Sequence, residues 1–328
     1  MDAVRDRITA VVAVLSIVIG ACSGGGAPTG SISAGDAAGS AVPSLGDPAT
    51  DKLAQVLARG RLLLPTDTAY PPASFAVAGA QRATDTHCAT DELTAPEVDG
   101  YDVATGKLVA QALGVEPCFV TPTWSEMIAG NWNDRWDIAF ASIGITRERM
   151  NGLFFTRPYY ATPERFYVRT SASTGLMEEL DGLRIGVCTG CFADLYLQKR
   201  LDIPGEQATY RVDNAVIVGY AVERTGLQDV VDGKLDAFLC QETAGQQAID
   251  EGLDLRGLEP AAYVAFPAGA IDRSSGKDVE AFLDQVDGIL VARFADGKLK
   301  ALSERYFGVD YATAAGAFDM AALNQLVD

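Results

Sequence analysis

The 328-residue sequence predicts a mixed α/β fold made of two successive units. Short runs rich in Val, Ile, Leu and Phe alternate with segments that place apolar residues at helical spacing, and the alternation starts again after about residue 162. Strands that alternate with helices favour parallel sheets with helices packed on their faces. The chain is long enough for two domains, and its apolar fraction of 48% can supply their cores.

The first unit begins near residue 51, where the composition becomes that of a globular protein. Its expected elements are a strand at residues 62–64, a helix over 100–113, a strand at 115–124, a short helix over 124–130 and a strand at 136–146. Gly114 is expected to end the first helix, because glycine suits a helix terminus.

The second unit repeats the alternation. Its expected elements are a strand at 183–190, a helix over 191–201, a strand at 208–213, a helix over 215–224, a strand at 235–242 and two C-terminal helices over 279–296 and 299–307. Ligands of open α/β sheets lie beyond the carboxyl ends of the strands. Two facing units would therefore set two such ends across a cleft.

The N-terminus has the features of an export signal. Two arginines precede an apolar run over residues 8–19, which is short for a membrane span but suits a signal peptide. Small residues directly before Cys22 resemble the bacterial lipobox, and a stretch rich in Gly, Ser, Ala and Pro follows. We expect a signal peptide over 1–21, lipidation of Cys22, a tether over 22–50 and anchoring to the outer face of the cell membrane. The alternative is an ordinary secretory signal that contains a cysteine.

Charge and composition exclude several classes of function. A formal net charge of −18 argues against binding nucleic acid or an anionic lipid surface, because both need clustered Lys and Arg. His87 is the single histidine, so neither a multi-histidine metal site nor a Ser-His-Asp triad is expected. We therefore expect no catalytic residue, metal or cofactor.

Five cysteines follow the lipobox, and an exported location permits disulfides between them. Because five is odd, at least one thiol stays free or pairs between chains. We expect Cys88 to bond Cys118, and Cys240 to bond Cys188 or Cys191. Cys188 and Cys191 also form a Cys-x-x-Cys motif between a strand and a helix, which would suit a redox protein or a zinc site. Neither a thioredoxin-like order of elements nor a fourth zinc ligand accompanies the motif, so a structural bridge is the favoured interpretation.

Five segments occur in an order that resembles one known family. They are "PTDTAYPPASF" (65–75), "VDGYDVATGKLVAQALGV" (98–115), residues 123–160 with "IGITRERMNGLFFTRPYY" at their end, "LDGLRIGVCTG" (180–190) and "GKLDAFLCQE" (233–242). Together they look like the bacterial extracellular solute-binding proteins of family 3, the periplasmic amino-acid-binding type that serves ABC transporters. The resemblance covers roughly residues 53–308.

This resemblance implies a periplasmic-binding-protein-like, two-lobed Venus-flytrap fold (type II). Two parallel-type sheets with covering helices would be joined by two crossover strands, with lobe 1 formed by 51–162 plus 262–328 and lobe 2 by 163–261. It implies a protein that captures a small carboxylate-bearing solute, such as an amino acid, in the interlobe cleft. The protein would act as a monomer and deliver the solute to the permease of an ABC importer.

The family's ligand-binding positions carry over residue by residue. The arginine three residues after Thr146 would clamp the ligand carboxylate, and Arg149 fits this role because a guanidinium pairs two donors with a carboxylate. Tyr70 and Trp124 would form walls around the ligand. The remaining positions that the resemblance implies are Asp67, Ser142, Gly144, Gly190, Cys191, Phe192 and Gln241.

Two departures put an ordinary α-amino acid in question. Gln241 stands where many amino-acid binders have the aspartate that accepts the ligand's ammonium, and a neutral amide provides no ion pair. Glu242 could substitute, although alternation along a strand would point it away. Cys191 and Phe192 replace hydroxyl-bearing residues near the carboxylate site. An enzyme on the same scaffold, similar to cyclohexadienyl dehydratase, or a ligand-sensing receptor subunit therefore remain alternatives.

Overall fold

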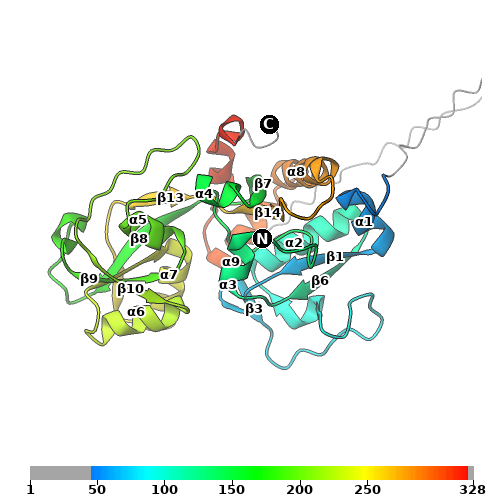
Figure 1. Ribbon diagram of the computed structural model, residues 1–328. Coiled ribbons are helices and arrows are strands. Elements are labelled where there is room, and N and C mark those ends of the chain that lie inside the picture. Colours follow the sequence, from blue (N-terminus) through cyan, green and yellow to red (C-terminus); the bar gives the residue numbers. More distant parts are fainter. Residues whose placement is uncertain (1–45, 324–328) are drawn as a thin grey trace, which may run out of the picture. The chain divides into compact units, whose positions relative to one another are not determined.

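The computed structural model describes residues 46–323. The expected signal peptide, Cys22 and most of the tether lie outside the described residues. Among the described residues, no helix combines the length and the apolar character that crossing a membrane requires. The described chain is a mixed α/β structure with several separate sheets (Figure 1).

A small mixed sheet, here called the β1 sheet, organises the first unit. Its strands are β1 (Arg61–Pro65), β6 (Glu116–Val120) and β4 (Leu93–Thr94); β1 and β6 are parallel and β4 is antiparallel to β6. Helix α2 (Tyr101–Leu113) makes the crossover and ends at Gly114, whose φ of 74° confirms the expected stop. The expected disulfide between Cys88 and Cys118 is present and ties the loop before β4 to β6.

Shorter elements complete this part of the chain. They are α1 (Lys52–Arg59), β2 (Ala69–Tyr70), β3 (Ser74–Ala76), η1 (Ala95–Glu97), β5 (Val98–Asp99), α3 (Trp124–Ala129), α4 (Arg147–Met150), β7 (Leu153–Pro158), β14 (Ala268–Asp272), α8 (Glu280–Ala295), α9 (Lys298–Phe307), η3 (Thr313–Ala317) and η4 (Met320–Ala322). The two C-terminal helices are those the sequence predicts, and α9 packs on α2 while α8 packs on β7. The C-terminal segment thus returns to the elements formed by the beginning of the chain.

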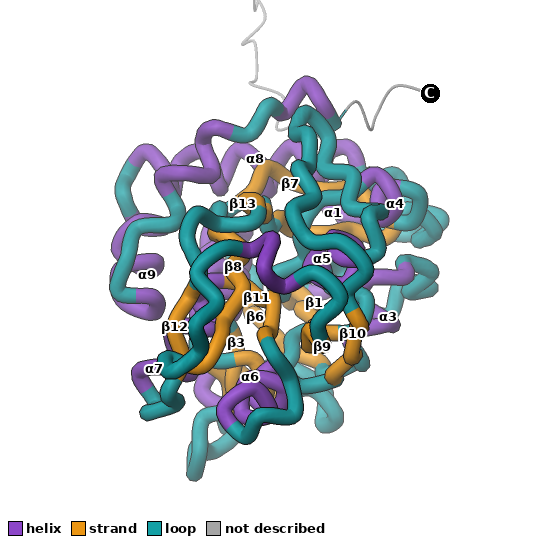
Figure 2. The backbone as a smooth tube through the Cα atoms, turned by 90° about the vertical axis from the view of Figure 1, so that its left-hand side faces the viewer, coloured by secondary structure: helices purple, strands orange, loops and turns teal. Residues whose placement is uncertain are grey.

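A larger sheet, here called the β8 sheet, organises the second unit. Its strands, in spatial order, are β10 (Val216–Tyr220), β9 (Arg184–Cys188), β11 (Ala237–Gln241), β8 (Thr162–Arg169) and β12 (Leu255–Gly257), with β13 (Tyr263–Ala265) also paired to β8. Helices η2 (Met177–Leu180), α5 (Phe192–Leu197), α6 (Glu223–Val231) and α7 (Glu242–Asp250) connect the strands (Figure 2). The strands β10, β9 and β11 are parallel, of which β9 and β11 were expected as strands, and β8 runs antiparallel to β11.

Three sequence-based assignments were wrong. The segment 215–224, expected to be a helix, is strand β10 followed by the start of α6, because its run of β-branched residues favours an extended chain. The segment 208–213 is not a strand. The segment 136–146 forms only isolated bridges, from Ala139 to Ala270 and from Gly144 to Pro267, since Ser142 has a left-handed φ of 53° that interrupts any continuous strand.

A buried polar network fixes the chain around Ser142. The Asp102 carboxyl, at the start of α2, accepts hydrogen bonds from Tyr159 Oη and Ser142 Oγ, each at 2.7 Å. Ser142 Oγ also lies 2.7 Å from the hydroxyl of Tyr160, which donates to Gln241 Oε1 at 3.1 Å. Burial raises the pKa of Asp102 to about 7, against the opposing effect of the Ser142 and Tyr159 hydrogen bonds. The network therefore joins helix α2, the Ser142 segment and the end of β11.

Asp102 should make stability depend on pH. Its pKa lies above the ordinary value of 3.8, so the folded protein holds a proton that the unfolded chain releases between about pH 4 and pH 7. Stability should fall as pH rises through this window, by on the order of 4 kcal/mol from this group. We predict that Asp102→Asn removes this part of the slope. Urea denaturation of both proteins from pH 4 to pH 7.5 measures it, and parallel stability curves would contradict the assignment.

Candidate functional site

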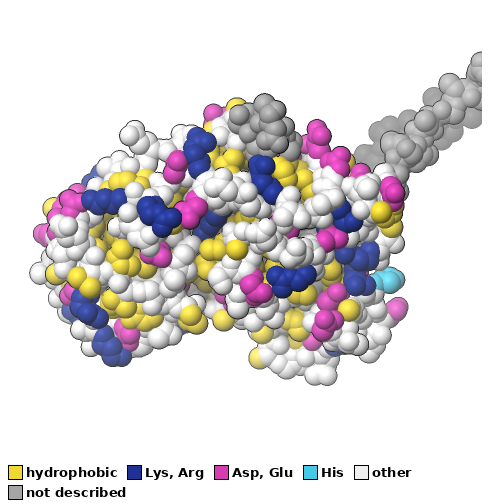
Figure 3. Space-filling view, in the orientation of Figure 1, with side chains coloured by type: hydrophobic (Ala, Val, Ile, Leu, Met, Phe, Trp, Pro, Cys, Tyr) yellow, Lys and Arg dark blue, Asp and Glu magenta, His cyan; other side chains and the backbone are white. Residues whose placement is uncertain are grey.

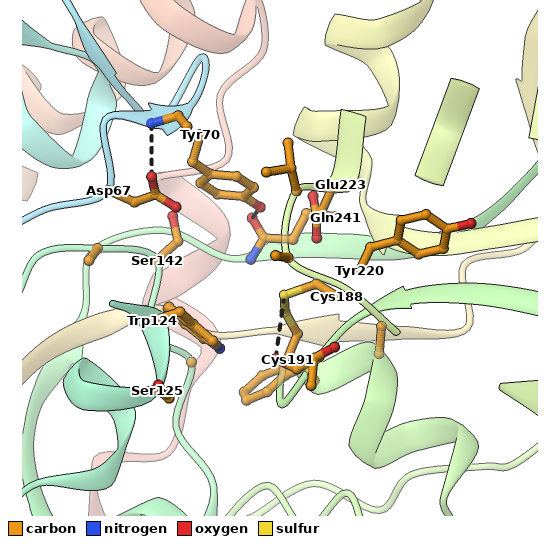
Figure 4. A pocket seen from close by; sticks show the side chains of 18 of the residues that line it. Asp67, Tyr70, Trp124, Ser125, Ser142, Cys188, Cys191, Tyr220, Glu223 and Gln241 are labelled. Atoms are coloured by element: carbon orange, nitrogen blue, oxygen red, sulfur yellow. Dashed lines mark hydrogen bonds between the residues drawn. A yellow bond between two sulfur atoms is a disulfide. The ribbon is translucent and has the colours of Figure 1, made fainter. Parts of the chain in front are cut away.

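A cavity of about 590 Å³ lies among residues drawn from both units. Its lining comes from the carboxyl ends of β1, β6, β9, β10 and β11, as the fold class predicts. The cavity is lined by nine of the ten ligand-binding residues that the sequence predicts, namely Asp67, Tyr70, Trp124, Ser142, Gly144, Arg149, Cys191, Phe192 and Gln241 (Figure 4). Gly190 does not line it, but its carbonyl contacts Arg149.

Arg149 is the one basic side chain in the lining. It is 6% exposed, and its guanidinium donates from Nη1 to Gly144 O at 2.9 Å and from Nη2 to Gly190 O at 3.0 Å. Burial lowers the pKa of Arg149 to about 10, so it remains charged at neutral pH. Within residues 46–323, no carboxylate forms an ion pair with it. The guanidinium is thus a buried cation held by two carbonyls.

Local sequence explains how Arg149 is held there. Thr146 caps helix α4, and its hydroxyl accepts a hydrogen bond from the Arg149 backbone N–H at 3.1 Å, which accounts for the Thr-x-x-Arg spacing. The guanidinium carbon lies 5.4 Å from the ring centre of Trp124 and 5.0 Å from that of Phe192. A Cβ atom at Gly144 would come within 2.1 Å of the Phe192 ring, so only glycine lets this ring approach.

Trp124 offers more than an apolar wall. Its indole Nε1 is buried at the cavity and has no hydrogen-bond partner among the described residues. An unpaired buried N–H is costly and usually marks a place for a ligand or water. The indole nitrogen and the Arg149 guanidinium therefore form an electropositive end of the cavity.

Gln241 is oriented differently from a residue that accepts an ammonium group. Its side-chain oxygen accepts from the hydroxyls of Tyr160 at 3.1 Å, Tyr70 at 3.2 Å and Thr243 at 3.4 Å. The amide nitrogen is left for the cavity, where it can only donate. Glu242 does not substitute, because it pairs with Arg165 and accepts a hydrogen bond from Tyr311 at 2.6 Å. The structure thus confirms that Glu242 points away.

Two acidic residues of the cavity were missed from the sequence. Glu164, on β8, is 2% exposed, and burial followed by repulsion from Glu223 raises its pKa well above the usual range. Glu223, at the start of α6, has a pKa raised to about 8 by burial and by Asp67. Strand β8 has the sequence TPERFYVR with three charged residues, so no local signal singled out Glu164. The wrong helix at 215–224 concealed Glu223.

The three cysteines at positions 188, 191 and 240 pair differently from the prediction. Cys188 and Cys191 are bonded to each other at the cavity wall, while Cys240 is free and buried, so the expected bond from Cys240 to one of them was wrong. Alternation along β11 explains the difference. Gln241 faces the cavity and the neighbouring Cys240 faces the opposite side, where it packs among Tyr167, Phe238 and Ala244.

Comparisons with known proteins agree with this architecture. Residues 83–309 match the family model "Bacterial extracellular solute-binding proteins, family 3". The chain is 25% identical to the L-cystine-binding protein TcyJ of Escherichia coli K12 over 275 residues, covering 83% of this chain and 91% of that protein. It is 26% identical to an L-arginine-binding protein of Pseudomonas aeruginosa over 252 residues, covering 74% and 86%.

A solved structure shows the same fold. The crystal structure of the ancestral amino acid-binding protein AncCDT-1, a precursor of cyclohexadienyl dehydratase, matches with a TM-score of 0.64 and 22% identity, covering 78% of this chain and all of that one. The fold is that of the two-lobed periplasmic amino-acid-binding proteins. With a family match over more than half of its length, the chain belongs to the bacterial extracellular solute-binding proteins of family 3.

Proposed function

We propose that this protein is a cell-surface lipoprotein that captures a small carboxylate-bearing solute, an amino acid or a related compound, and delivers it to an ABC importer. The carrying observation is Arg149, a buried cation that faces the cavity without a carboxylate partner in residues 46–323. A buried charge is stable only when it is paired, and a ligand carboxylate would supply the opposite charge. The unpaired Trp124 indole N–H would donate to the same carboxylate.

The same arginine would couple binding to the relative position of two lobes. We assign lobe 1 to 51–162 plus 262–328 and lobe 2 to 163–261, which is supported by the β8 sheet, because its strands other than β13 and the first residue of β8 lie between residues 163 and 261. Gly144 lies in the proposed lobe 1 and Gly190 in the proposed lobe 2, and Arg149 donates to both carbonyls. Solute binding would thereby present a distinct surface to the permease.

Basic and acidic side chains are interspersed on the face shown in Figure 3. With a net charge of −18, the protein would not bind nucleic acid, because it lacks the excess of Lys and Arg that phosphate binding needs.

Arg149→Ala should abolish or strongly weaken solute binding. The expected loss is about 2 to 5 kcal/mol, the range for truncating one member of a buried charge pair. Arg149→Lys should restore little, because an ammonium cannot form the paired planar contact. Trp124→Phe keeps the wall and removes the N–H, so it should weaken carboxylates selectively. Calorimetry with the best hit of a thermal-shift screen against amino acids and small carboxylates measures these effects.

Arg147→Ala is the matched control for this series. Arg147 lies two residues away in the same helix, but its half-exposed side chain pairs with Asp202 outside the cavity. The control should bind solute as the wild type does. Full-strength binding by a folded Arg149→Ala protein would show that the carboxylate site lies elsewhere.

Anchoring has its own test. Cys22→Ser should move the protein from the membrane fraction to the soluble fraction or the medium, because the tether alone has no membrane affinity. The full-length protein expressed in its bacterial host, followed by fractionation and immunoblotting, gives the answer. Unchanged membrane retention of the variant would disprove lipidation at this cysteine.

The second candidate function is an enzyme on this scaffold. AncCDT-1 is a precursor of cyclohexadienyl dehydratase. In this chain Glu223, with a pKa of about 8, could act as a general acid. A cyclohexadienyl dehydratase of Pseudomonas aeruginosa is 25% identical over 225 residues, but we favour binding over catalysis because the relatives matched over more of their length are named as binding proteins. We predict no conversion of prephenate or arogenate by the purified domain, measured by chromatography of the products. Turnover that depends on Glu223 would overturn the proposal.

A further inference from the structure

Two carboxyl groups in the cavity lack the partners that buried acids normally have. Glu164 has neither a hydrogen-bond donor nor an ion-pair partner within reach among residues 46–323. One carboxylate oxygen of Glu223 is enclosed and likewise unpaired in the described chain. Asp67, the third acid of the lining, differs because it accepts the Ala69 N–H at 2.8 Å and so braces its own loop. Glu164 and Glu223 are therefore acceptors that face the cavity without a donor.

The position of Glu164 explains how Gln241 can stand where many amino-acid binders have an aspartate. The two residues are direct partners across the antiparallel strands β8 and β11. Side chains of such partners lie on the same face of the sheet, about 5 Å apart at Cβ. An acid lost at one position is thus replaced by an acid one strand away. Arg149 and Glu164 both line the cavity and form no ion pair with each other in the described chain, so each can bind a separate group of one ligand.

Glu223 lies on a different element and faces another part of the cavity. Its carboxylate comes within 4.8 Å of the sulfur atoms of Cys188 and Cys191, at the wall formed by their disulfide. Figure 4 shows its side chain beside those of Gln241 and Cys188. A ligand that reaches from Arg149 past Glu164 would bring its far end towards this second acid.

The charges of the lining thus describe a ligand. The unpaired cation offers a site for one carboxylate, and the two carboxyls without donors offer sites for two cationic groups, whose binding would stabilise the ionised form of each carboxyl. We propose that the solute is a basic amino acid whose carboxylate binds Arg149, whose α-ammonium binds Glu164 and whose side-chain cation binds Glu223. This inference rests on the proposed function and adds the solute class. A solute with two carboxylates, such as L-cystine, would leave one of them without a cation in this lining.

The test uses ligands that differ by one group. L-Lysine and L-ornithine carry all three charged groups, and L-norleucine and L-norvaline lack only the side-chain amine. 6-Aminohexanoate lacks the α-ammonium of lysine, and 1,5-diaminopentane lacks its carboxylate. Calorimetry with the tether-free domain, residues 46–328, should give affinities for the basic amino acids about 10- to 100-fold higher than for each analogue, the scale of one charged hydrogen bond. L-Arginine should group with lysine, and L-cystine should bind more weakly than the basic amino acids.

Two conservative variants assign the cationic groups. Glu223→Gln should reduce the preference for lysine over norleucine to near one while leaving the affinity for norleucine unchanged. Glu164→Gln should weaken lysine and norleucine alike and leave 6-aminohexanoate unaffected. Glu242→Gln is the matched control, because this neighbouring acid is paired with Arg165 and lies outside the cavity lining. Thermal melting of each variant verifies that it is folded.

Proton release gives a readout that does not depend on affinity alone. The groups that interact electrostatically with Glu223 are Asp67, Tyr70, Glu164 and Cys240, and burial followed by Asp67 raises the pKa of Glu223 to about 8. A cation bound at Glu223 would expel its proton near pH 7, so the binding enthalpy of lysine should depend on the ionisation enthalpy of the buffer. Glu223→Gln should reduce this dependence.

The outcomes separate the two levels of the proposal. Arg149-dependent binding of norleucine with an affinity equal to that of lysine would overturn the basic-solute assignment and leave carboxylate capture standing. Binding of the diamine as strongly as lysine, without effect of Arg149→Ala, would overturn carboxylate capture itself. Equal losses for lysine and norleucine in Glu223→Gln would remove Glu223 from the ligand's cationic end.

Discussion

The site depends on the interactions made by the buried guanidinium of Arg149. Its two terminal nitrogens reach carbonyls of Gly144 and Gly190, which lie 46 residues apart in different parts of the chain. The ring of Phe192 can stack near the guanidinium only because Gly144 has no side chain. One charged group thus fixes the Ser142–Gly144 segment, the loop before α5 and the aromatic wall at the same time. Burying the Arg149 charge costs free energy unless an anion pairs with it. The guanidinium therefore constrains both the local structure and the kind of ligand that would fit the cavity.

A second constraint comes from the hydroxyl groups around Gln241. Tyr70, Tyr160 and Thr243 all donate to its side-chain oxygen. Because that oxygen is occupied, the position cannot accept an ammonium as an aspartate would. The network continues through Ser142 to Asp102, whose burial raises its pKa to about 7. The amide at position 241 therefore belongs to a connected hydrogen-bond network, and its cross-strand partner on β8 is the carboxyl of Glu164.

The distribution of charge in the cavity differs from that of the whole molecule. The net charge of −18 is spread over the chain and does not identify a ligand. In the cavity, one cation and three acids lie in a partly enclosed space where electrostatic interactions are stronger than in water. The pKa values of Glu164 and Glu223 are raised because ionising a buried carboxyl costs free energy when no cation lies beside it. A solute that carries cationic groups would remove that cost, so the cavity would be selective for such solutes.

The sequence by itself determined the mixed α/β class, the two C-terminal helices and the end of α2 at Gly114, because apolar periodicity and glycine stops are local signals. The two-lobed fold and Arg149, which lies at the cavity, were identified through the resemblance to the family. It also placed nine of its ten predicted ligand residues in the lining. Only the tertiary structure decided which residues lie opposite each other on neighbouring strands and which face of a strand each residue occupies. The register between β8 and β11 pairs Glu164 with Gln241, and the face of β11 separates Cys240 from the Cys188–Cys191 disulfide. Such contacts join residues far apart in the chain, so no local pattern encodes them. The β-branched run before Glu223 favours an extended chain, and its pairing with β9 places it in the sheet.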